Sequence, residues 1–229
     1  MPSAPRTARA LARAELTRAI LERASVQLAE VGPAALSVRQ IARDLEMAPS
    51  AVYRYFPSRD ALLTALLIRA FDDMGAVVED GAARGADLRG RFTGAAHALR
   101  GWARAHPHEY ALTYGSPVPG YAAPRDTVAS ATRVAAVLLA IIRDAQVEGR
   151  PLGARTREVS PAERAAVAPI SGFVEPALDD AHTARAMVVW ATLFGHVSLE
   201  LFGHMNNAVL DYDEHFTTVV GQLADDLGL

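Results

Sequence analysis

The stretch from Ser37 to Arg59 restricts the possible folds of this chain more than any other part of its sequence. It reads SVRQIARDLEMAPSAVYRYFPSR. Ser37 can cap the N-terminus of a helix, and Gln40 three residues later completes the pattern of a capping box. Four apolar residues then recur at helical spacing, which predicts a short amphipathic helix: Val38, Ile41, Ala42 and Leu45.

A second short helix is predicted directly after the first. Glu46-Met47 interrupts the apolar pattern and Ala48-Pro49 restarts it, because proline suits the first turn of a helix. Val52 and Phe56 supply a buried side, so the two helices and their turn predict a helix-turn-helix. The other side carries groups that can reach the phosphates and base edges of DNA, those of Ser50, Tyr53, Arg54 and Tyr55.

The end of this stretch has the most specific pattern. Residues Tyr53–Leu62 follow the order Tyr-x-(Tyr/His)-Phe-x-x-(Lys/Arg)-x-x-Leu, close behind one long N-terminal helix. Through Ser37–Ala42, Ala51–Phe56 and Arg59–Leu63 the chain resembles the DNA-binding core of the TetR family of transcriptional regulators. The resemblance implies double-stranded DNA as a partner.

The same resemblance implies DNA contacts for individual residues. Side chains of the second helix are expected in the major groove, and flanking side chains are expected to position the head on phosphates. The first set is Ser50, Ala51, Tyr53 and Arg54, the second is Arg39, Tyr55, Ser58 and Arg59, and Ser37, Gln40 and Pro49 complete the expected DNA-binding residues.

Two positions depart from the family pattern. The family often has glycine in the turn where this chain has Glu46, and a left-handed glutamate would cost about 1–2 kcal/mol. The second helix usually has a hydroxyl cap, which Ala48 cannot supply, at a cost of about 1 kcal/mol. These departures keep open an interaction protein whose head has lost DNA binding.

The charge of the chain is divided unevenly. Residues 1–59 hold nine arginines and five acidic residues, whereas the rest hold 14 arginines and 21 acidic residues. A basic N-terminal unit on an acidic body suits a head that binds a polyanion. With 229 residues, no cysteine and no long apolar run, the sequence indicates a cytoplasmic protein without disulfides, secretory signal or membrane span.

Helical periodicity continues along the chain, and no strand pattern competes with it. We expect an all-α fold of about nine or ten helices. Residues 1–57 are expected to form a three-helix DNA-binding domain, and residues 58–229 a larger helical domain for effector binding and dimerisation. The predicted helices cover about 10–31, 58–81, 87–105, 106–114, 126–148, 160 onward, 182–205 and 211–227.

The C-terminal half resembles one subgroup of TetR regulators, in which a late helix carries Trp, then His-Gly, before a Ser-Leu-Glu-Leu-Phe-Gly-His run. Here Trp190 and Ser198–His204 match, but Phe194 stands where His is usual before Gly195. The resemblance implies a homodimer in which the last two helices of each protomer form a four-helix bundle. The alternative is that these helices close the protomer's own core. The expected interface residues are Ala191, Gly195, Ser198, Phe202, Tyr212, Phe216, Val220 and Leu223.

An effector pocket is expected in the body of the protein. Aromatic residues that join apolar area to hydrogen-bonding tips are its candidates, and their alternative role is in the core. These residues are Trp102, His106, Tyr110, Tyr114, Tyr121, Phe173 and Trp190. The histidines lack the spacing of a metal site, and no Gly-x-Ser-x-Gly or phosphate-binding loop occurs, so neither a metal, a cofactor nor catalytic residues are predicted.

The combined prediction is a regulator that binds DNA conditionally. It would be a homodimeric repressor on a palindromic operator, released by an apolar, aromatic or polycyclic effector. Three alternatives remain open: a DNA-binding protein that ignores ligands, an interaction protein, and a helical enzyme acting on a small molecule.

Overall fold

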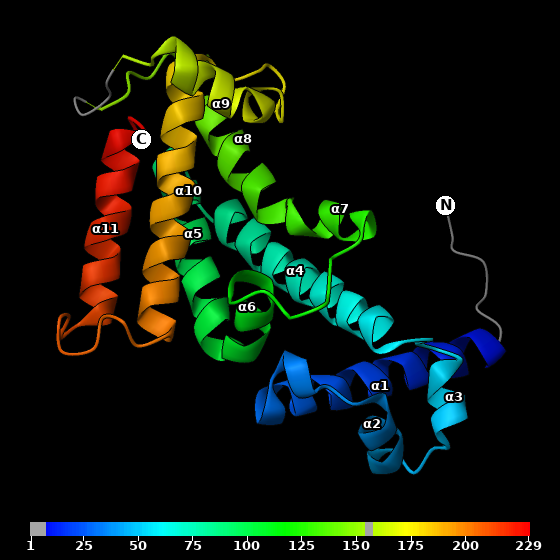
Figure 1. Cartoon of the computed structure of the whole chain (residues 1–229). Helices are drawn as coiled ribbons and strands as arrows, with labels where there is room; N and C mark the ends of the chain where they lie inside the picture. Colours follow the sequence, from blue (N-terminus) through cyan, green and yellow to red (C-terminus); the bar gives the residue numbers. More distant parts are fainter. Residues whose placement is uncertain (1–7, 154–157) are drawn as a thin grey trace. The chain divides into compact units, whose positions relative to one another are not determined.

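The computed structural model describes residues 8–153 and 158–229, and all regular secondary structure in this part of the chain is helical (Figure 1). No strand occurs in it, and none of its helices is long and apolar enough to cross a bilayer. The predicted all-α fold is confirmed. Its α-helices are α1 (Ala8–Val31), α2 (Val38–Asp44), α3 (Pro49–Tyr53), α4 (Arg59–Ala83), α5 (Leu88–Ala105), α6 (Pro107–Tyr114), α7 (Val128–Ala131), α8 (Arg133–Val147), α9 (Pro161–Ser171), α10 (Asp180–Leu201) and α11 (Tyr212–Asp226).

The chain forms two compact units. The first contains the residues up to Ala70 together with His108–Val128, and the second contains Phe71–Pro107 and Ala129–Leu229. This division differs from the predicted boundary between residues 57 and 58. The reason is that Leu62 and Leu63, in the first turns of α4, are fully buried in the core of the first unit.

Four helices, α1, α2, α3 and α4, contribute to the core of the first unit. Ile20 of α1, Ile41 of α2 and Val52 of α3 have no exposed surface, so each helix contributes one buried face. Residues from the later segment pack against this core as well, and they were not expected in the head: Leu112, Val118 and Tyr121.

The start of α2 is capped differently from the prediction. Ser37 Oγ accepts a hydrogen bond from the Gln40 amide at 3.3 Å, as expected. The return half of the capping box comes from Gln27 of α1, whose Oε1 accepts a hydrogen bond from the Ser37 amide at 2.6 Å. Gln27 is buried, so this bond links α1 to α2 inside the unit. The predicted role of the Gln40 side chain in the cap was therefore wrong.

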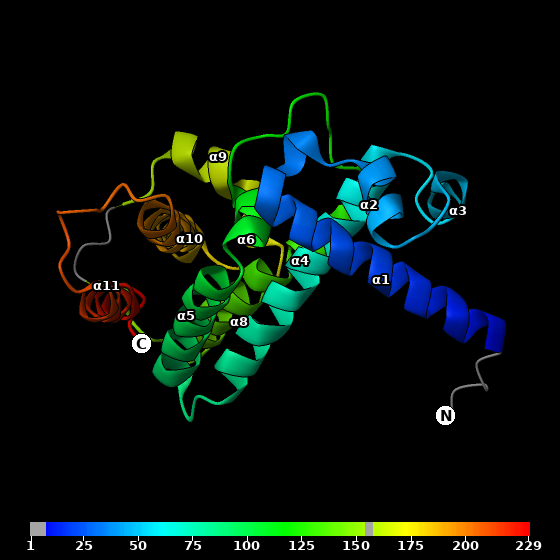
Figure 2. The same ribbon diagram turned by 90° about the horizontal axis from the view of Figure 1, so that it is seen from below.

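The second unit is built from α5, α8, α10 and α11 with the second half of α4. Figure 2 looks along α10 and α11 and shows them side by side. Side-chain caps begin four of its helices: Asp87 caps α5, Ser160 caps α9, Asp179 caps α10 and Asp211 caps α11. The capping pattern predicted at Ser160 is confirmed, since its Oγ accepts a hydrogen bond from the Glu163 amide at 3.2 Å.

The predicted single helix over 126–148 is divided in the structure. A 3₁₀ turn (Arg125–Thr127) and α7 precede α8. Thr132 occupies the cap position of α8, but its side chain accepts no hydrogen bond from the first turn of that helix. At the start of α8 the Arg133 guanidinium donates to the carboxylate of Glu79 and, at 2.8 Å, to the carbonyl of Asp72. Apolar periodicity runs through this division, so the pattern alone did not reveal it.

Ion pairs of one buried arginine, Arg100, connect three helices of this unit. Arg100 of α5 donates to Glu200 of α10 through Nε at 2.6 Å and through a second nitrogen at 2.8 Å. It also pairs with Asp213 of α11 at 2.7 Å, and its guanidinium lies 5.0 Å from the ring centre of Phe216. The Arg100 and Glu200 side chains are only 7% and 10% exposed, so the pair is shielded from water.

Three residues predicted at the dimer interface lie inside the protomer. Phe216, Val220 and Leu223 of α11 are at most 5% exposed. Phe216 packs against the rings of His97 and His196, whose centres are 5.4 Å and 5.1 Å away. The prediction for these three residues was wrong, because α11 turns its apolar face toward the interior of its own unit.

We expect thermal stability to fall as the pH drops below about 6.5. Burial lowers the pKa of His196, as does neighbouring His215, and burial lowers the pKa of His97 near Arg100. Both ring nitrogens of His196 are buried without a hydrogen-bond partner in the described part of the chain. Between pH 6.5 and the lowered pKa values that these two histidines have in the folded state, the unfolded chain therefore binds more protons than the folded chain.

The measurement is the unfolding temperature between pH 8 and pH 5. His196→Leu, which keeps a similar volume without a titrating group, should flatten part of the dependence, whereas His108→Leu at an exposed position should not. An equally steep dependence in His196→Leu would contradict the assignment to this residue.

Candidate DNA-binding site and effector cavity

The turn between α2 and α3 is closed by two backbone hydrogen bonds. The Met47 amide donates to the Ala42 carbonyl at 2.8 Å, and the Glu46 amide donates to the Arg43 carbonyl at 3.0 Å. This is the Schellman pattern, which places one residue in the left-handed region. That residue is Glu46, with a φ of 54°, so the turn has the conformation that suits glycine. Met47 packs against the core of the unit and holds the turn in place.

The start of α3 lacks a side-chain cap. Ala48 occupies the cap position with φ −66° and ψ 138°, and Pro49 follows in the first turn. Its extended backbone is the conformation from which a serine oxygen could accept a hydrogen bond from the first turn of the helix. The expected departures at Glu46 and Ala48 are both present in the structure.

We expect Glu46→Gly and Ala48→Ser each to raise the free energy of unfolding, by about 1 kcal/mol. Glycine removes the left-handed strain, and serine supplies the missing acceptor. Glu46→Ala keeps the same strain and should gain nothing, which makes it the matched control. Urea unfolding of the full chain measures the effect, and a gain from Glu46→Ala equal to that from Glu46→Gly would contradict the argument.

Helix α3 presents its two faces as predicted. Val52 and Phe56 are buried beneath it. Ser50, Tyr53 and Arg54 are exposed on its outer side, where Tyr53 is 40% exposed. A hydroxyl, a phenol and a guanidinium thus stand together on one short helix. These groups can donate hydrogen bonds to base edges and phosphates.

The predicted DNA-binding residues of α2 are partly engaged within the unit. Arg39 is exposed, whereas Gln40 donates to Asp44 at 2.7 Å and accepts from Arg43. Asp44 also accepts from Arg23 of α1 at 2.5 Å. The hydrogen bonds from Arg23 and Gln40 lower the pKa of Asp44, so this carboxylate is held ionised and ties α2 to α1.

Ser58 and Arg59 have structural partners at the start of α4. Ser58 Oγ accepts a hydrogen bond from the Ala61 amide at 3.0 Å and caps the helix. The Arg59 guanidinium donates to the carbonyls of Pro33 and Ala34 at 2.6 Å and 3.1 Å. Arg59 therefore joins α4 to the turn that follows α1, and a phosphate contact from it stays a prediction.

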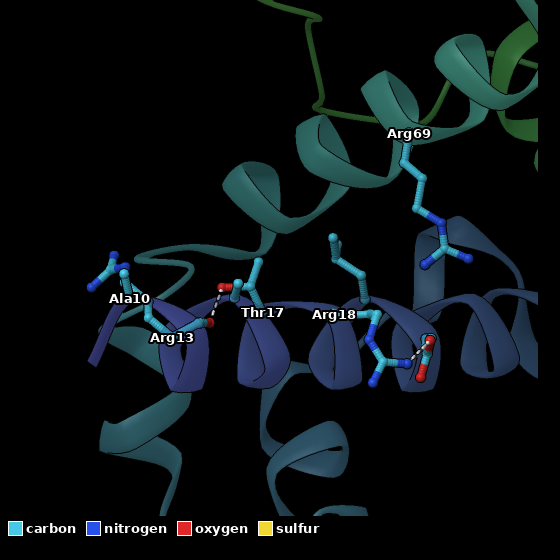
Figure 3. Close-up of a pocket in the computed structure, with 8 residues that line it drawn as sticks. Ala10, Arg13, Thr17, Arg18 and Arg69 are labelled. Atoms are coloured by element: carbon cyan, nitrogen blue, oxygen red, sulfur yellow. Dashed lines mark hydrogen bonds and ion pairs between the residues drawn. The ribbon is translucent and has the colours of Figure 1, made fainter. Parts of the chain in front are cut away.

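One basic residue near α3 was missed in the sequence. The Arg13 guanidinium of α1 lies 5.3 Å from the ring centre of half-buried Tyr55. Arg13 also lines an open groove of about 650 Å³ between α1 and α4, where Figure 3 shows Thr17 and Arg18 on α1 and Arg69 on α4. Arg18 is paired with Glu22 at 2.8 Å. No local pattern could reveal Arg13, because its contact with Tyr55 spans two distant segments.

Comparisons with known proteins agree with this geometry. A family model described as "Bacterial regulatory proteins, tetR family" matches residues 20–66, and one described as "Tetracyclin repressor-like, C-terminal domain" matches residues 92–223. The HTH-type transcriptional regulator Rv1816 of Mycobacterium tuberculosis is 38% identical over 204 residues, which cover 84% of this chain and 83% of that protein. The chain belongs to the TetR family. It is therefore a DNA-binding transcriptional regulator.

Solved structures show the same fold. The regulatory protein SCO4313 is 31% identical, with a TM-score of 0.79 over 96% of this chain and 98% of that chain. A protein of unknown function from Rhodococcus sp. RHA1 is 27% identical, with a TM-score of 0.70 over 91% and 93% of the two chains. The TetR regulator PfmR from Thermus thermophilus, at 18% identity and a TM-score of 0.59 over 89% and 96%, shares the fold alone.

The seven aromatic candidates for effector binding lie in three places of the TetR fold. Trp102 is buried and stacks on His106 at the end of α5, with ring centres 5.1 Å apart. The three tyrosines belong to the first unit, where Tyr121 shares a 2.9 Å hydrogen bond with Thr64. Burial raises the pKa of Tyr114, whose ring centre lies 5.4 Å from that of Tyr110.

Phe173 and Trp190 are the two candidates that line a common cavity. It has a volume of about 180 Å³ and lies between α8, the end of α9 and α10. Uncharged and mostly aliphatic residues form the rest of the wall, and none of them was predicted as a site residue. In the sequence, these residues were marked by the apolar face of α8, but an ordinary core produces the same pattern. The further wall residues are Thr132, Ala135, Leu138, Leu139, Ile142, Ile170, Ala186 and Met187.

Proposed function

We propose that this TetR regulator is a homodimeric repressor that binds a palindromic operator in the cytoplasm and is released by a small apolar effector. The observation that carries the proposal is the apolar cavity between α8, α9 and α10, in a chain whose other unit exposes a recognition helix. A DNA-binding protein that ignores ligands has no use for such a cavity. The cavity therefore favours conditional binding over the ligand-independent alternative.

On DNA, α3 would read the major groove through Ser50, Tyr53 and Arg54. Arg39 and Arg13 would neutralise phosphates on either side, since both are exposed arginines of the same unit. One short helix reads few base pairs, so sequence preference would come from two copies. Two heads on one face of the duplex favour half-sites about 34–36 Å apart, one turn of DNA.

Dimerisation is supported by the outer face of α10. Val188, Ala191, Leu199 and Phe202 are exposed there, and half-buried Gly195 lies in the same stripe. These positions recur every three or four residues, so they form one continuous apolar stripe with a small residue near its middle. Such a stripe allows a second α10 to approach closely. We propose that Ala191, Gly195, Ser198 and Phe202, with Tyr212 of α11, form the interface.

Gly195→Arg is expected to raise the dimer dissociation constant at least about a hundredfold, since like charges would meet across the two-fold axis. The protomer should tolerate the change, because a β-carbon placed on Gly195 meets no atom within 4 Å among the described residues. Gly101→Arg is the matched control, since Gly101 of α5 is equally free of neighbours. Sedimentation equilibrium measures the constant, and an unchanged dimer would contradict this interface.

The proposed function is tested by selecting operators from random duplex DNA with the full protein. An inverted repeat with half-sites one helical turn apart is expected, with affinity that falls as salt rises. Small apolar compounds are then added to the complex in a gel-shift assay. Binding without sequence preference would support an architectural protein, and an operator complex that no apolar compound weakens would contradict effector release.

A further inference from the structure

We propose that the cavity between α8, α9 and α10 selects uncharged molecules of one or two aromatic rings, and excludes charged molecules and larger polycyclic ones. This inference rests on the proposed function, because it names the class of effector for the cavity already described. It replaces the wider expectation of aromatic or polycyclic effectors with one class.

Charge is excluded by the composition of the wall. None of the described residues that line the cavity is charged, and the single hydroxyl, on Thr132, donates to the Ala129 carbonyl at 3.2 Å. An ionised group that leaves water needs an opposite charge or several hydrogen bonds, and without them its burial is strongly unfavourable. A carboxylate or an ammonium group would find neither here.

Size is limited by the volume of the cavity. The cavity has a volume of about 180 Å³ and is open to solvent on one side. An apolar cavity of about 150 Å³ engineered in another protein binds benzene, whereas sites for drug-sized ligands occupy about 300–1,000 Å³. A single substituted ring or two fused rings therefore fit the space, and three fused rings exceed it at the packing density of a protein interior. Leu138, Leu139 and Ile142 are buried on one side, so that part of the wall cannot recede without disturbing the core.

Entry is possible from the solvent side. Phe173 and Met187 are 48% and 38% exposed at the cavity, and methionine adapts its shape easily. Trp190 contributes to the wall, and its ring centre is 4.1 Å from that of Phe194. A molecule in the cavity would thus change the surroundings of an indole, which provides an optical signal.

The experiment uses the full-length dimer in a Trp102→Phe background, where Trp190 is the remaining tryptophan. Toluene is titrated while Trp190 fluorescence and the unfolding temperature are recorded, without DNA. Benzoate and benzylamine carry the same ring with a charge, and phenanthrene has three fused rings. Toluene is expected to bind about a hundredfold more tightly than either charged probe. Phenanthrene is expected to bind at least about tenfold more weakly than toluene.

Two matched substitutions test the location. Ala135→Leu fills part of the cavity and should weaken toluene binding at least about tenfold. Ala136→Leu makes the same change one residue later on an exposed part of α8 and should leave binding unchanged. Ala186→Leu, from the opposite wall, provides a second test if Ala135→Leu fails to fold. Equal effects of Ala135→Leu and Ala136→Leu would overturn the location.

The outcomes separate this inference from the proposed function. Equal binding of benzoate and toluene, or binding of phenanthrene as tight as that of toluene, overturns the selectivity. Toluene that binds without weakening the operator complex supports the selectivity and overturns effector release by this class. Absence of toluene binding overturns the inference, while release of DNA by another class of compound would leave the proposed function standing.

Discussion

Glu200→Ala is expected to lower the free energy of unfolding by about 3–5 kcal/mol. The substitution leaves Arg100 charged in a site where its side chain is only 7% exposed. The guanidinium cannot avoid the penalty by losing its proton, because arginine remains protonated in proteins even without an acidic partner. For a domain of this size the unfolding temperature should fall by roughly 6–20 °C.

Two further variants distinguish a buried pair from ordinary surface charge. Asp213→Asn removes the second partner of Arg100, but the Asp213 side chain is 75% exposed, so the loss should stay within about 1 kcal/mol. Replacing both Arg100 and Glu200, by Met and Leu, should restore much of the stability, since no buried charge then remains. Calorimetry measures all three. A loss of under about 1 kcal/mol for Glu200→Ala would show that water reaches the pair.

Arg54→Ala and Tyr53→Ala are each expected to weaken operator binding by about 1–3 kcal/mol, a factor of roughly 5 to 150. Both side chains are exposed at the end of α3, and neither belongs to the core of the first unit. Folding and dimerisation should therefore be unaffected. The measurement is gel-shift affinity for the selected operator and for a scrambled duplex at several salt concentrations.

The control is Arg84→Ala, which removes an exposed arginine just after α4, with an 80% exposed side chain in the second unit. It changes the net charge as Arg54→Ala does, so a general charge effect would appear in both. If Arg54 contacts a base, its loss relaxes sequence preference; if it contacts a phosphate, binding weakens equally on both duplexes. Unchanged affinity in both Arg54→Ala and Tyr53→Ala would contradict the assignment of α3 as the reading helix.

The DNA-binding head was predictable because its signals are local. The spacing of Val38, Ile41 and Leu45, the proline at the start of α3 and the Tyr-x-Tyr-Phe ending predicted the helices and the family. The left-handed conformation of Glu46 was anticipated as well, because the TetR family often has glycine at this position of the turn. In each case the deciding atoms lie within a few residues along the chain.

The dimer prediction shows what local sequence patterns cannot determine, which is the packing partner of a helix. Helices α10 and α11 are both apolar enough to pack against another helix, and periodicity cannot say which partner each one has. The structure places Phe216, Val220 and Leu223 inside the protomer and leaves Ala191 and Phe202 outside. The same ambiguity affected the aromatic residues, of which Phe173 and Trp190 share a cavity and Trp102 does not.

The sequence by itself determined the helical class, the head and its family, because those follow from periodicity, capping and short motifs. Only the tertiary structure decided that Gln27 completes the cap of α2, that Arg13 lies on Tyr55, and that α8 and α10 enclose a cavity without charges. The physical reason is the range of the interactions. A helix is specified by neighbours in sequence, whereas a cap from another helix, a buried ion pair and the lining of a cavity depend on which distant faces meet.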